Sequence, residues 1–345
     1  MAERVPVGLA GLGRMGRVHA AALTSRCTLA RLGCVFDVDE AAARAAGERL
    51  DVPWTASYDE LLARSEAVAV ATPTGTHAEL VMRAAAAGRP VFCEKPISLD
   101  RATTVEVIEA VRRAGVALQV GFHRRFDPDW VAVTGRISAG ELGEVTLFRT
   151  SLRDMTPPPV QFLAGSGGFF VDVTVHDLDV ARWMVGEVVE VSAHGAATDP
   201  QIARTGDVDT AVVVLRFANG ALGVIDGSRA ARYGYECATE VMGTLATARI
   251  ETPPRHHYEW RTPGWASHEL PRDFEQRYPW AYAAELDGFA ECVRSGAPPR
   301  VTGLDALAAF DLARAADRSW RTGRTVPVTA VPVEGGVEYE IEEQG

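Results

Sequence analysis

The sequence predicts an α/β domain built on a doubly wound parallel sheet, followed by an α+β domain built on a large, mostly antiparallel sheet. Strands and helices alternate through residue 122, and strands in series with tight turns follow from about residue 145. A length of 345 residues also exceeds that of one typical domain. We therefore expect one domain over residues 1–122 and a second over residues 123–345.

The first domain is expected to contain five short apolar strands separated by four helices. The expected strands are Val5–Ala10, Arg31–Phe36, Ala67–Ala71, Pro90–Cys93 and Val116–Gly121. The expected helices begin near Met15 and then run over Ala41–Leu50, His77–Ala87 and Ala102–Ala114. Glycines end the last two of these helices, as is common where a backbone must turn out of a helix.

The second domain is expected to begin with six strands and to end with two helices. The expected strands are Glu144–Leu152, Glu187–Ala197, Asp207–Phe217, Ala221–Arg229, Tyr235–Met242 and Thr247–Glu251, and Ala218-Asn219-Gly220 suits a hairpin turn. The helices Trp280–Arg294 and Leu304–Trp320 complete this domain, and Thr302 and Asp305 fit the start of the second helix. The acidic stretch Glu334–Gly345 fits either an edge strand or a frayed tail, and we favour a tail after Ile341.

The composition is that of an ordinary globular protein, with 47% hydrophobic and 23% charged residues. A net charge of −11 argues against nucleic acid or an anionic membrane as a general partner. No apolar run is long enough to span a bilayer, and the strand at Val5 leaves no room for a signal peptide. The five cysteines lack disulfide or zinc spacing. We therefore expect a cytoplasmic protein with reduced thiols and no metal.

A glycine-rich turn, Gly11-Leu12-Gly13-Arg14-Met15-Gly16, follows the first expected strand and opens the first expected helix. Gly11 permits a tight turn, Gly13 lets backbone N–H groups approach a pyrophosphate, and Gly16 lets helix and strand pack closely. Such a motif is weak evidence alone, but its place between strand and helix predicts a dinucleotide-binding Rossmann domain.

Two acidic residues compete for the ribose-binding position of that domain. Asp37 ends the second expected strand, 21 residues after Gly16, where a carboxylate binds ribose hydroxyls and repels a 2′-phosphate. Asp39 fits a solvated helix start, and a plain turn residue is the alternative for Asp37. The spacing favours Asp37 and predicts NAD rather than NADP.

The loop after the third expected strand would border the same cofactor. Thr72, Pro73 and Thr74 lie where that strand ends, at the carboxyl edge of the sheet. His77 is a further candidate for cofactor contact, although we prefer to interpret it as a helix-start residue without a chemical role.

Lys95 is the only lysine among the 35 basic residues of the chain. Arginine stays charged at any reachable pH, whereas lysine is a compact charge whose pKa responds to its surroundings. Lys95 follows the strand Pro90–Cys93, so it lies at the carboxyl edge of the sheet with Glu94, and Pro96 restricts the backbone there. The alternative is that a composition rich in arginine retained one lysine by chance.

A second reactive pair is expected after the double glycine Gly167-Gly168. If a helix begins near Val173, Asp172 and His176 are four residues apart and share one face. A lone histidine beside the apolar stripe Leu178, Ala181, Trp183 and Met184 is more often structural. The aspartate partner and the dinucleotide-binding motif favour catalysis.

Three motifs in this order, Gly11–Gly16, Glu94-Lys95-Pro96 and Gly168–His176, resemble those of the Gfo/Idh/MocA oxidoreductases. The resemblance covers nearly the whole chain and is strongest to the inositol 2-dehydrogenases. Supporting segments are Gln119–Phe122, Arg124–Asp127, Tyr233–Glu236 and Glu240–Gly243. The chain departs from the family pattern at His123, Glu236, Cys237-Ala238-Thr239 and the loop Thr156–Pro159.

The resemblance implies that Lys95, Asp172 and His176 are catalytic and that Tyr235 touches a cyclic polyol. It also implies a homo-oligomer, a tetramer or dimer, formed through the face of the C-terminal sheet. Further candidates for substrate contact are Asp154, Tyr282 and Arg125. For Tyr282 the alternative is a core position, and for Arg124 and Arg125 it is a solvated or ion-paired surface position.

The expected reaction is the NAD-dependent oxidation of a secondary ring hydroxyl of an inositol or related sugar to a ketone, with hydride passing to nicotinamide C4. His176 is the expected general base and Lys95 stabilises the alkoxide, although the two could exchange roles because they titrate together. The alternatives are a keto-sugar or inosose reductase, a sugar oxidoreductase that uses NADP, and a non-catalytic NAD-binding sensor.

Overall fold

The computed structural model describes residues 3–163 and 165–342 and divides the chain into two compact units. The first unit runs to Asp127 and also includes Pro279–Leu307. The second unit consists of Pro128–Tyr278 and the residues from Ala308 onward. The chain thus passes between the units three times, whereas the sequence predicts a single passage after residue 122.

The first unit is built on a six-stranded sheet in the order β3-β2-β1-β4-β5-β6. All neighbouring strands are parallel, as the alternating pattern predicts. The strands are β1 (Val5–Ala10), β2 (Ala30–Phe36), β3 (Trp54–Thr55), β4 (Ala67–Val70), β5 (Val91–Cys93) and β6 (Leu118–Val120). The sequence does not predict β3, because two residues carry no readable periodicity.

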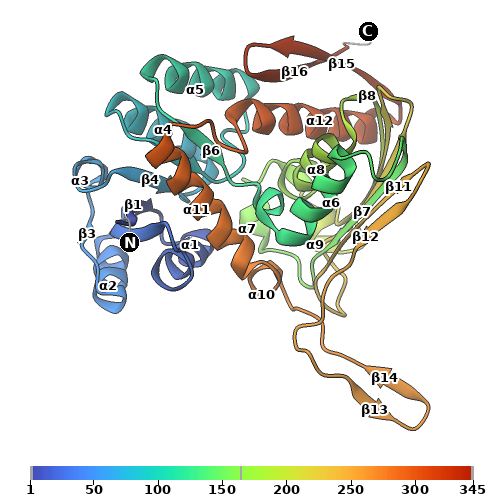
Figure 1. The fold of residues 1–345 in the computed structure, drawn as a ribbon, viewed down its shortest axis with the longest axis horizontal. Helices are drawn as coiled ribbons and strands as arrows, with labels where there is room; N and C mark the ends of the chain where they lie inside the picture. Colours follow the sequence, from blue (N-terminus) through green and yellow to red (C-terminus); the bar gives the residue numbers. More distant parts are fainter. Residues whose placement is uncertain (1–2, 164, 343–345) are drawn as a thin grey trace. The chain divides into compact units, whose positions relative to one another are not determined.

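Helices cover both faces of this sheet (Figure 1). They pack in pairs, α4 with α5 on one face and α1 with α11 on the other. The helical elements are α1 (Arg14–Ser25), α2 (Glu40–Leu50), α3 (Tyr58–Ala63), η1 (Thr74–Thr76), α4 (His77–Ala86), α5 (Arg101–Ala114), η2 (His123–Phe126) and α11 (Pro279–Ser295). The short α3, η1 and η2 are not predicted from the sequence.

Helix α11 belongs to the first unit, although the sequence analysis assigns it to the second domain. Asp287 accepts hydrogen bonds from the backbone N–H groups of Thr28 and Leu29, each at 2.8 Å. Leu286 and Phe289 are fully buried in the core that contains β1 and β2. The apolar spacing identifies a helix correctly, but it does not say which sheet the helix covers.

The second unit is built on an eight-stranded sheet in the order β12-β11-β7-β10-β9-β8-β15-β16. It is mostly antiparallel as predicted, with β7 and β10 as a parallel pair. The strands are β7 (Val145–Arg153), β8 (Val188–Ala196), β9 (Thr210–Phe217), β10 (Leu222–Ser228), β11 (Glu236–Gly243), β12 (Thr247–Ile250), β15 (Val326–Val333) and β16 (Gly336–Ile341). The predicted hairpin turn joins β9 to β10, and Gly220 has the positive φ of 88° that this turn needs.

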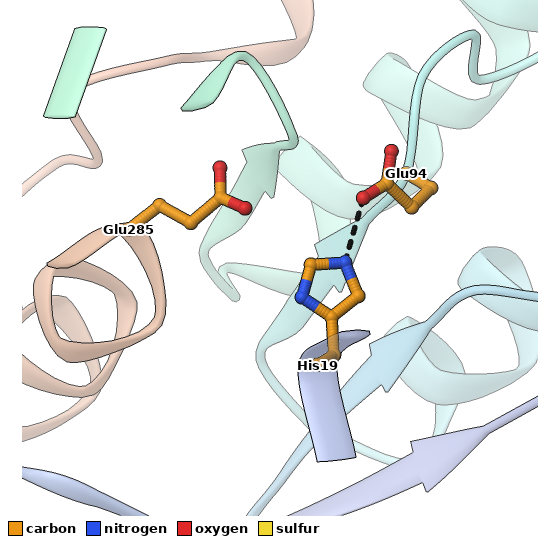
Figure 2. Close-up of side chains that lie close together, drawn as sticks. All are labelled: His19, Glu94 and Glu285. Atoms are coloured by element: carbon orange, nitrogen blue, oxygen red, sulfur yellow. Dashed lines mark hydrogen bonds and ion pairs between the residues drawn. The ribbon is translucent and has the colours of Figure 1, made fainter. Parts of the chain in front are cut away.

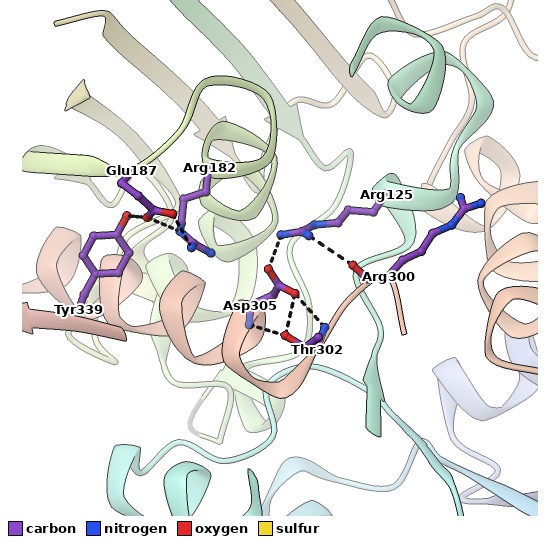
Figure 3. Close-up of polar contacts among 7 residues, drawn as sticks. All are labelled: Arg125, Arg182, Glu187, Arg300, Thr302, Asp305 and Tyr339. Atoms are coloured by element: carbon purple, nitrogen blue, oxygen red, sulfur yellow. Dashed lines mark hydrogen bonds and ion pairs between the residues drawn. The ribbon is translucent and has the colours of Figure 1, made fainter. Parts of the chain in front are cut away.

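The acidic C-terminal stretch forms the edge strand β16 through Ile341, and residues 343–345 lie outside the described residues. Tyr339 of this strand is buried and donates a hydrogen bond to Glu187, which also pairs with Arg182 at 2.9 Å (Figure 3). The stretch through Ile341 is therefore an edge strand that one buried tyrosine anchors.

The helical elements of the second unit lie on one side of its sheet, and a small hairpin projects away from it (Figure 1). The helical elements are α6 (Pro128–Ser138), α7 (Val160–Leu163), η3 (Phe170–Thr174), α8 (Val175–Val185), α9 (Pro200–Ala203), α10 (Phe274–Arg277) and most of α12 (Gly303–Thr322), and the hairpin strands are β13 (Trp260–Thr262) and β14 (Trp265–Ser267). Among the described residues, no helix combines the length and apolarity needed to cross a bilayer.

Helix α12 (Gly303–Thr322) begins with the residues that the sequence predicts. The Thr302 hydroxyl accepts a hydrogen bond from the Asp305 backbone N–H at 3.1 Å, and Asp305 Oδ2 accepts one from the Thr302 N–H at 2.9 Å (Figure 3). This reciprocal pair satisfies two donors that the helix itself leaves unbonded.

Candidate functional site

The glycine-rich turn has the geometry that a bound pyrophosphate requires. Gly11 has a positive φ of 93°, and a Cβ on Gly16 would lie 2.0 Å from the Gly11 carbonyl oxygen, so a larger residue cannot fit there. A Cβ on Gly13 would meet nothing within 4 Å. Helix α1 begins without a side-chain cap from Gly13 and without an acidic residue in its first turn. This helix end is therefore suited to an anion.

Asp37 is positioned beside this turn at the end of β2. Its Oδ2 atom accepts a hydrogen bond from the Leu12 backbone N–H at 3.0 Å, and Oδ1 accepts one from the Asp39 N–H at 3.1 Å. Asp39 caps helix α2 by accepting the N–H of Ala41, which confirms its expected place at a helix start. The glycines and the Asp37 carboxylate together fit the pyrophosphate and ribose of NAD.

His77 joins two loops at the carboxyl edge of the parallel sheet. It is the first residue of α4 and is 1% exposed. Its Nδ1 atom lies 2.8 Å from the Pro96 carbonyl oxygen and its Nε2 atom 2.8 Å from the Thr72 carbonyl oxygen. A neutral imidazole can donate to only one of these oxygens, so both contacts are hydrogen bonds only in the imidazolium form. The helix-start interpretation is therefore incomplete, because His77 also links the Thr72 loop to the Lys95 loop.

Lys95 follows β5 in a loop, and the buried side chain of Glu94 contacts the backbone of that loop. The Glu94 Oε1 atom lies 2.6 Å from Nε2 of buried His19, and Oε2 accepts the Lys95 backbone N–H at 3.2 Å. Glu94 is 7% exposed, and Lys95 is half-buried. The sequence does not predict this role of His19, because its position on an amphipathic helix looks like that of any core residue.

The two arginines after β6 are buried, so the expectation of a surface position is wrong for both. Arg124 is 2% and Arg125 is 7% exposed. The Arg125 guanidinium lies 3.1 Å from Asp305 Oδ1 and 3.5 Å from the Arg300 carbonyl oxygen (Figure 3). Tyr282 of α11 is also buried, with its ring 4.8 Å from that of His123.

The helix that carries Asp172 and His176 begins earlier than the sequence predicts. Residues 168 and 169 are already helical, and Phe170–Thr174 form a π turn before α8. Gly167 and Gly168 have positive φ values of 83° and 85°, which lets the chain turn into this helix. Because a π turn is wider than an α turn, equal spacing in sequence does not by itself put two residues on one face.

Arg229 holds the carboxylate of Asp172. Its Nη2 atom lies 2.8 Å from Asp172 Oδ2, and its Nη1 atom lies 3.0 Å from Asp207 Oδ2. Arg229 is 0% exposed and its guanidinium lies 5.2 Å from the centre of the Phe169 ring. A buried guanidinium shared by two carboxylates is a strong, directional contact. Sequence reasoning misses Arg229, because one arginine at a strand end carries no local signal.

Asp207 also holds the double-glycine turn. Its Oδ1 atom accepts the Phe169 backbone N–H at 2.9 Å, and a Cβ on Gly168 would lie 3.4 Å from the same oxygen. The turn before Asp172 and the Asp172 carboxylate are therefore attached to the same guanidinium, one through Asp207 and the other directly.

The remaining substrate candidates of the second unit lie near the ends of β7 and β11. Asp154 is half-buried, and its backbone N–H donates to the Ser228 carbonyl oxygen at 2.8 Å. Tyr235 is 3% exposed, and its ring lies edge-on to Tyr278 at 6.2 Å. The loop that carries Thr156 lines an open cavity of about 390 Å³. Of the expected catalytic set, Lys95 belongs to the first unit, and Asp172 and His176 belong to the second.

Known proteins resemble this chain over nearly its full length. The myo-inositol 2-dehydrogenase of Thermotoga maritima is 41% identical over 94% of this chain and 99% of its own length. The scyllo-inositol 2-dehydrogenase (NAD⁺) of Bacillus subtilis is 37% identical over 94% of this chain and 97% of its own length. A crystal structure of Lactobacillus casei scyllo-inositol dehydrogenase with NAD(H) and scyllo-inositol covers 94% of this chain and 99% of its own, with a TM-score of 0.87 and 26% identity.

Two family descriptions cover most of the chain. Residues 5–122 match the NAD-binding Rossmann fold of an oxidoreductase family, and residues 135–328 match the C-terminal alpha/beta domain of the same family. The first match contains the glycine-rich turn, Asp37 and Lys95, and the second contains Asp172, His176 and Arg229. The chain is therefore an oxidoreductase of the Gfo/Idh/MocA family, with residues 5–122 as its NAD-binding domain.

Proposed function

We propose that this enzyme oxidises a secondary ring hydroxyl of an inositol or a closely related cyclic polyol to the ketone. The observation that carries the proposal is the full-length similarity to inositol 2-dehydrogenases, at 37–41% identity, in a chain that has the complete Lys95, Asp172 and His176 set. A non-catalytic NAD sensor would not need all three.

His176 removes the proton of the substrate hydroxyl in this proposal. The ammonium of Lys95 lowers the energy of the developing alkoxide by its charge and a hydrogen bond. Asp172 accepts a hydrogen bond from the substrate, and Arg229 orients its carboxylate.

NAD, when bound, supplies the acceptor of the substrate hydride. The backbone N–H groups of the turn from Gly11 to Gly16 bind its pyrophosphate, and Asp37 binds its ribose hydroxyls. Thr72, Pro73, Thr74 and Glu94 border the cofactor at the carboxyl edge of the sheet, and His77 keeps two of the loops together.

Tyr235, Asp154, Tyr282 and Arg125 are the further candidates for polyol contact. Arg125 is the weakest, because Asp305 already binds its guanidinium. Asp154 is the best supported of these four candidates, because a half-buried carboxylate can accept a hydrogen bond from a polyol hydroxyl.

The assembly that we propose is a tetramer or dimer formed through the large sheet. The strand register places Val212, Val214, Leu222 and Met242 on one face of that sheet. Their exposed fractions of 40–50% are high for apolar side chains. Sedimentation at several protein concentrations measures the assembly state.

For the compartment we propose the cytoplasm, which five buried free cysteines support.

The decisive experiment measures NADH formation with a panel of inositol isomers and aldoses. We expect turnover on at least one inositol isomer and loss of most of it in Lys95→Arg, because the broad guanidinium cannot take the place of a compact ammonium. Arg113→Lys, an exposed conservative change in α5, is the control. An enzyme that binds NAD but turns over no member of the panel would contradict the proposal.

A further inference from the structure

A buried polar cluster lies behind the Lys95 loop and has no place in the proposed reaction. It consists of His19 of α1, Glu94 after β5 and Glu285 of α11. One nitrogen or oxygen atom of each side chain lies within 4.8 Å of the others, and all three residues are buried. Figure 2 shows the Glu285 carboxyl group pointing toward the His19 ring.

Glu285 is the unusual member of this cluster. Its side chain is 0% exposed, and neither carboxyl oxygen has a hydrogen-bond partner among the described residues. Its backbone, in contrast, is well bonded, because Gln119 Nε2 donates to the Glu285 carbonyl oxygen at 2.7 Å. An ionised carboxylate without partners is among the most costly groups that a protein interior can contain.

One ring nitrogen of His19, Nδ1, likewise has no hydrogen-bond partner among the described residues. The ionised Glu94 carboxylate can only accept, so the 2.6 Å contact requires His19 Nε2 to carry a hydrogen. In the neutral ring Nδ1 is then an acceptor, and it has no partner among the described residues. Figure 2 shows this nitrogen on the side of the ring that faces Glu285. The His19 ring is also flanked edge-on by Phe92 at 5.1 Å and Tyr282 at 5.9 Å.

The position of Glu94 is tightly constrained on its other side. Its Oε2 atom accepts the Lys95 backbone N–H, and a Cβ on Gly121 would lie only 3.1 Å from that oxygen. Glycine at 121 therefore leaves the room that the Glu94 carboxylate occupies. A change in the charge or orientation of Glu94 acts directly on the Lys95 backbone.

We propose that Glu285 is a neutral carboxylic acid whose O–H group serves the Nδ1 side of His19, directly or through one buried water molecule. In this series of contacts Glu285 donates to His19, His19 donates to the Glu94 carboxylate, and Glu94 accepts the Lys95 backbone N–H. Glu285 is thus a positioning residue. The positioning of Lys95 by Glu285 rests on the proposed function, whereas the neutral state of Glu285 does not depend on that function.

The electrostatics of the cluster agree with a neutral Glu285. Burial raises the pKa of the Glu285 carboxyl well above its usual range, and the negative charge of Glu94 raises it further. The other titratable or charged side chains on the elements packed against α11, on the adjoining loops and on α11 itself include Arg14, Arg17, His19, Arg26, Cys27, Arg31, Cys34, Asp37, Lys95, His123, Arg124, Arg125, Asp127, Tyr282, Asp287, Glu291, Cys292 and Arg294.

A divalent cation is the competing interpretation, because one imidazole and two carboxylates can form a metal site. Two observations favour the proton. Glu94 and His19 already occupy each other at hydrogen-bond distance, and a neutral Glu285 needs no path for an ion into a fully buried space. Metal analysis of the purified protein distinguishes the two.

The test compares wild-type protein with Glu285→Gln and with Glu291→Gln, an exposed position on the same helix. The infrared band of a protonated carboxylic acid should be present in wild type, absent in Glu285→Gln and unchanged in Glu291→Gln. Neither this measurement nor the next uses a substrate, so both remain informative if the proposed polyol reaction fails.

Denaturant unfolding at several pH values gives the second readout. A raised native pKa means that the native state keeps a proton that the unfolded state releases above its usual pKa of 4.5. The contribution of this proton to stability is therefore complete below that pH and is lost as pH rises through the native pKa. The unfolding constant of wild type relative to Glu285→Gln should rise by up to about tenfold per pH unit.

The positioning role has its own readout in turnover. Glutamine keeps an N–H donor at this position and should retain most of kcat, whereas Glu285→Leu removes the donor and should lower kcat by about tenfold. Equal kcat in both variants would overturn the positioning role. Parallel pH slopes in wild type and Glu285→Gln, or a stoichiometric divalent cation lost in Glu285→Gln, would overturn the neutral acid.

Discussion

Two carboxylates of the proposed site, Glu94 next to Lys95 and Asp172 of the catalytic set, are held by different kinds of partner. Glu94 in the first unit contacts His19 at 2.6 Å, and the buried Glu285 carboxyl lies close to both. Asp172 in the second unit contacts Arg229 at 2.8 Å, and that guanidinium also binds Asp207. Burial raises the pKa of the Glu285 carboxyl beside Glu94, whereas an arginine guanidinium stays charged at any reachable pH. The first arrangement should respond to pH and the second should not.

The largest expected effect tests whether His176, in the second unit, carries the chemistry. His176→Ala should lower kcat by roughly 10²–10⁴-fold, because it removes the proposed general base. NAD affinity should remain nearly unchanged, since the cofactor contacts lie in residues 5–122. Steady-state kinetics and calorimetric NAD titration measure both. His194→Ala, at an exposed position on β8, is the control, and an active His176→Ala enzyme would refute the assignment.

The next effect tests how much the ion pairs of Arg229 with Asp172 and Asp207 stabilise the fold. Arg229→Leu leaves two partly buried carboxylates without their cation and should lower the free energy of unfolding by about 3–5 kcal/mol. Arg216→Leu, whose exposed guanidinium pairs with Glu190, should cost no more than about 1 kcal/mol. Urea unfolding measures both variants. A comparable loss in the two would show that burial does not strengthen the Arg229 contacts.

A smaller effect is expected on NAD binding from Asp37 of the first unit, whose carboxylate accepts hydrogen bonds from backbone N–H groups. Asp37→Asn should weaken NAD binding by roughly 10- to 100-fold, because hydrogen bonds to a charged group are worth about 1.5–3 kcal/mol. Discrimination against NADP should decrease as well, since the repelling charge is gone. In the control, Asp39→Asn, the helix cap is altered but NAD affinity is not. Equal NAD affinity in wild type and Asp37→Asn would place the ribose elsewhere.

The smallest expected effect comes from a helix cap and sets the scale for the buried ion pair of Arg229. Thr302→Ala removes the hydroxyl that caps α12 and should lower the free energy of unfolding by about 1 kcal/mol. Thr322→Ala at the other end of the same helix should change it less, because its exposed hydroxyl only bonds back to Arg318. Thermal or urea unfolding checks the pair. A Thr302 effect as large as that of Arg229 would undermine the comparison.

The local elements of this fold were readable because their signals are local. Apolar runs bounded by glycine predict the parallel strands, Asn219-Gly220 predicts the β9–β10 turn, and Thr302 with Asp305 predicts the start of α12. Each depends on neighbours within a few residues, where backbone geometry and capping chemistry act directly. The motif positions Gly11–Gly16 and Lys95 follow in the same way, from where a strand ends.

The contacts that tune those positions join residues far apart in sequence. Periodicity predicts α11 as a helix, yet Asp287 and Leu286 attach it to a sheet formed more than two hundred residues earlier. Arg229 is 57 residues from Asp172, and His19 is 75 residues from Glu94. No local pattern identifies such pairs, because an arginine at a strand end or a histidine on an amphipathic helix looks ordinary until the chain has folded.

From its residues alone, this protein is a two-part NAD-dependent oxidoreductase with one lysine placed at the edge of a parallel sheet. Glycine turns, strand ends and family motifs suffice for that conclusion, since they encode backbone geometry. Folding adds which groups surround the reactive ones: a permanently charged guanidinium for Asp172, and a titratable histidine and acid for Glu94. Those partners depend on burial and long-range packing, because removal from water is what makes a single buried charge or proton matter.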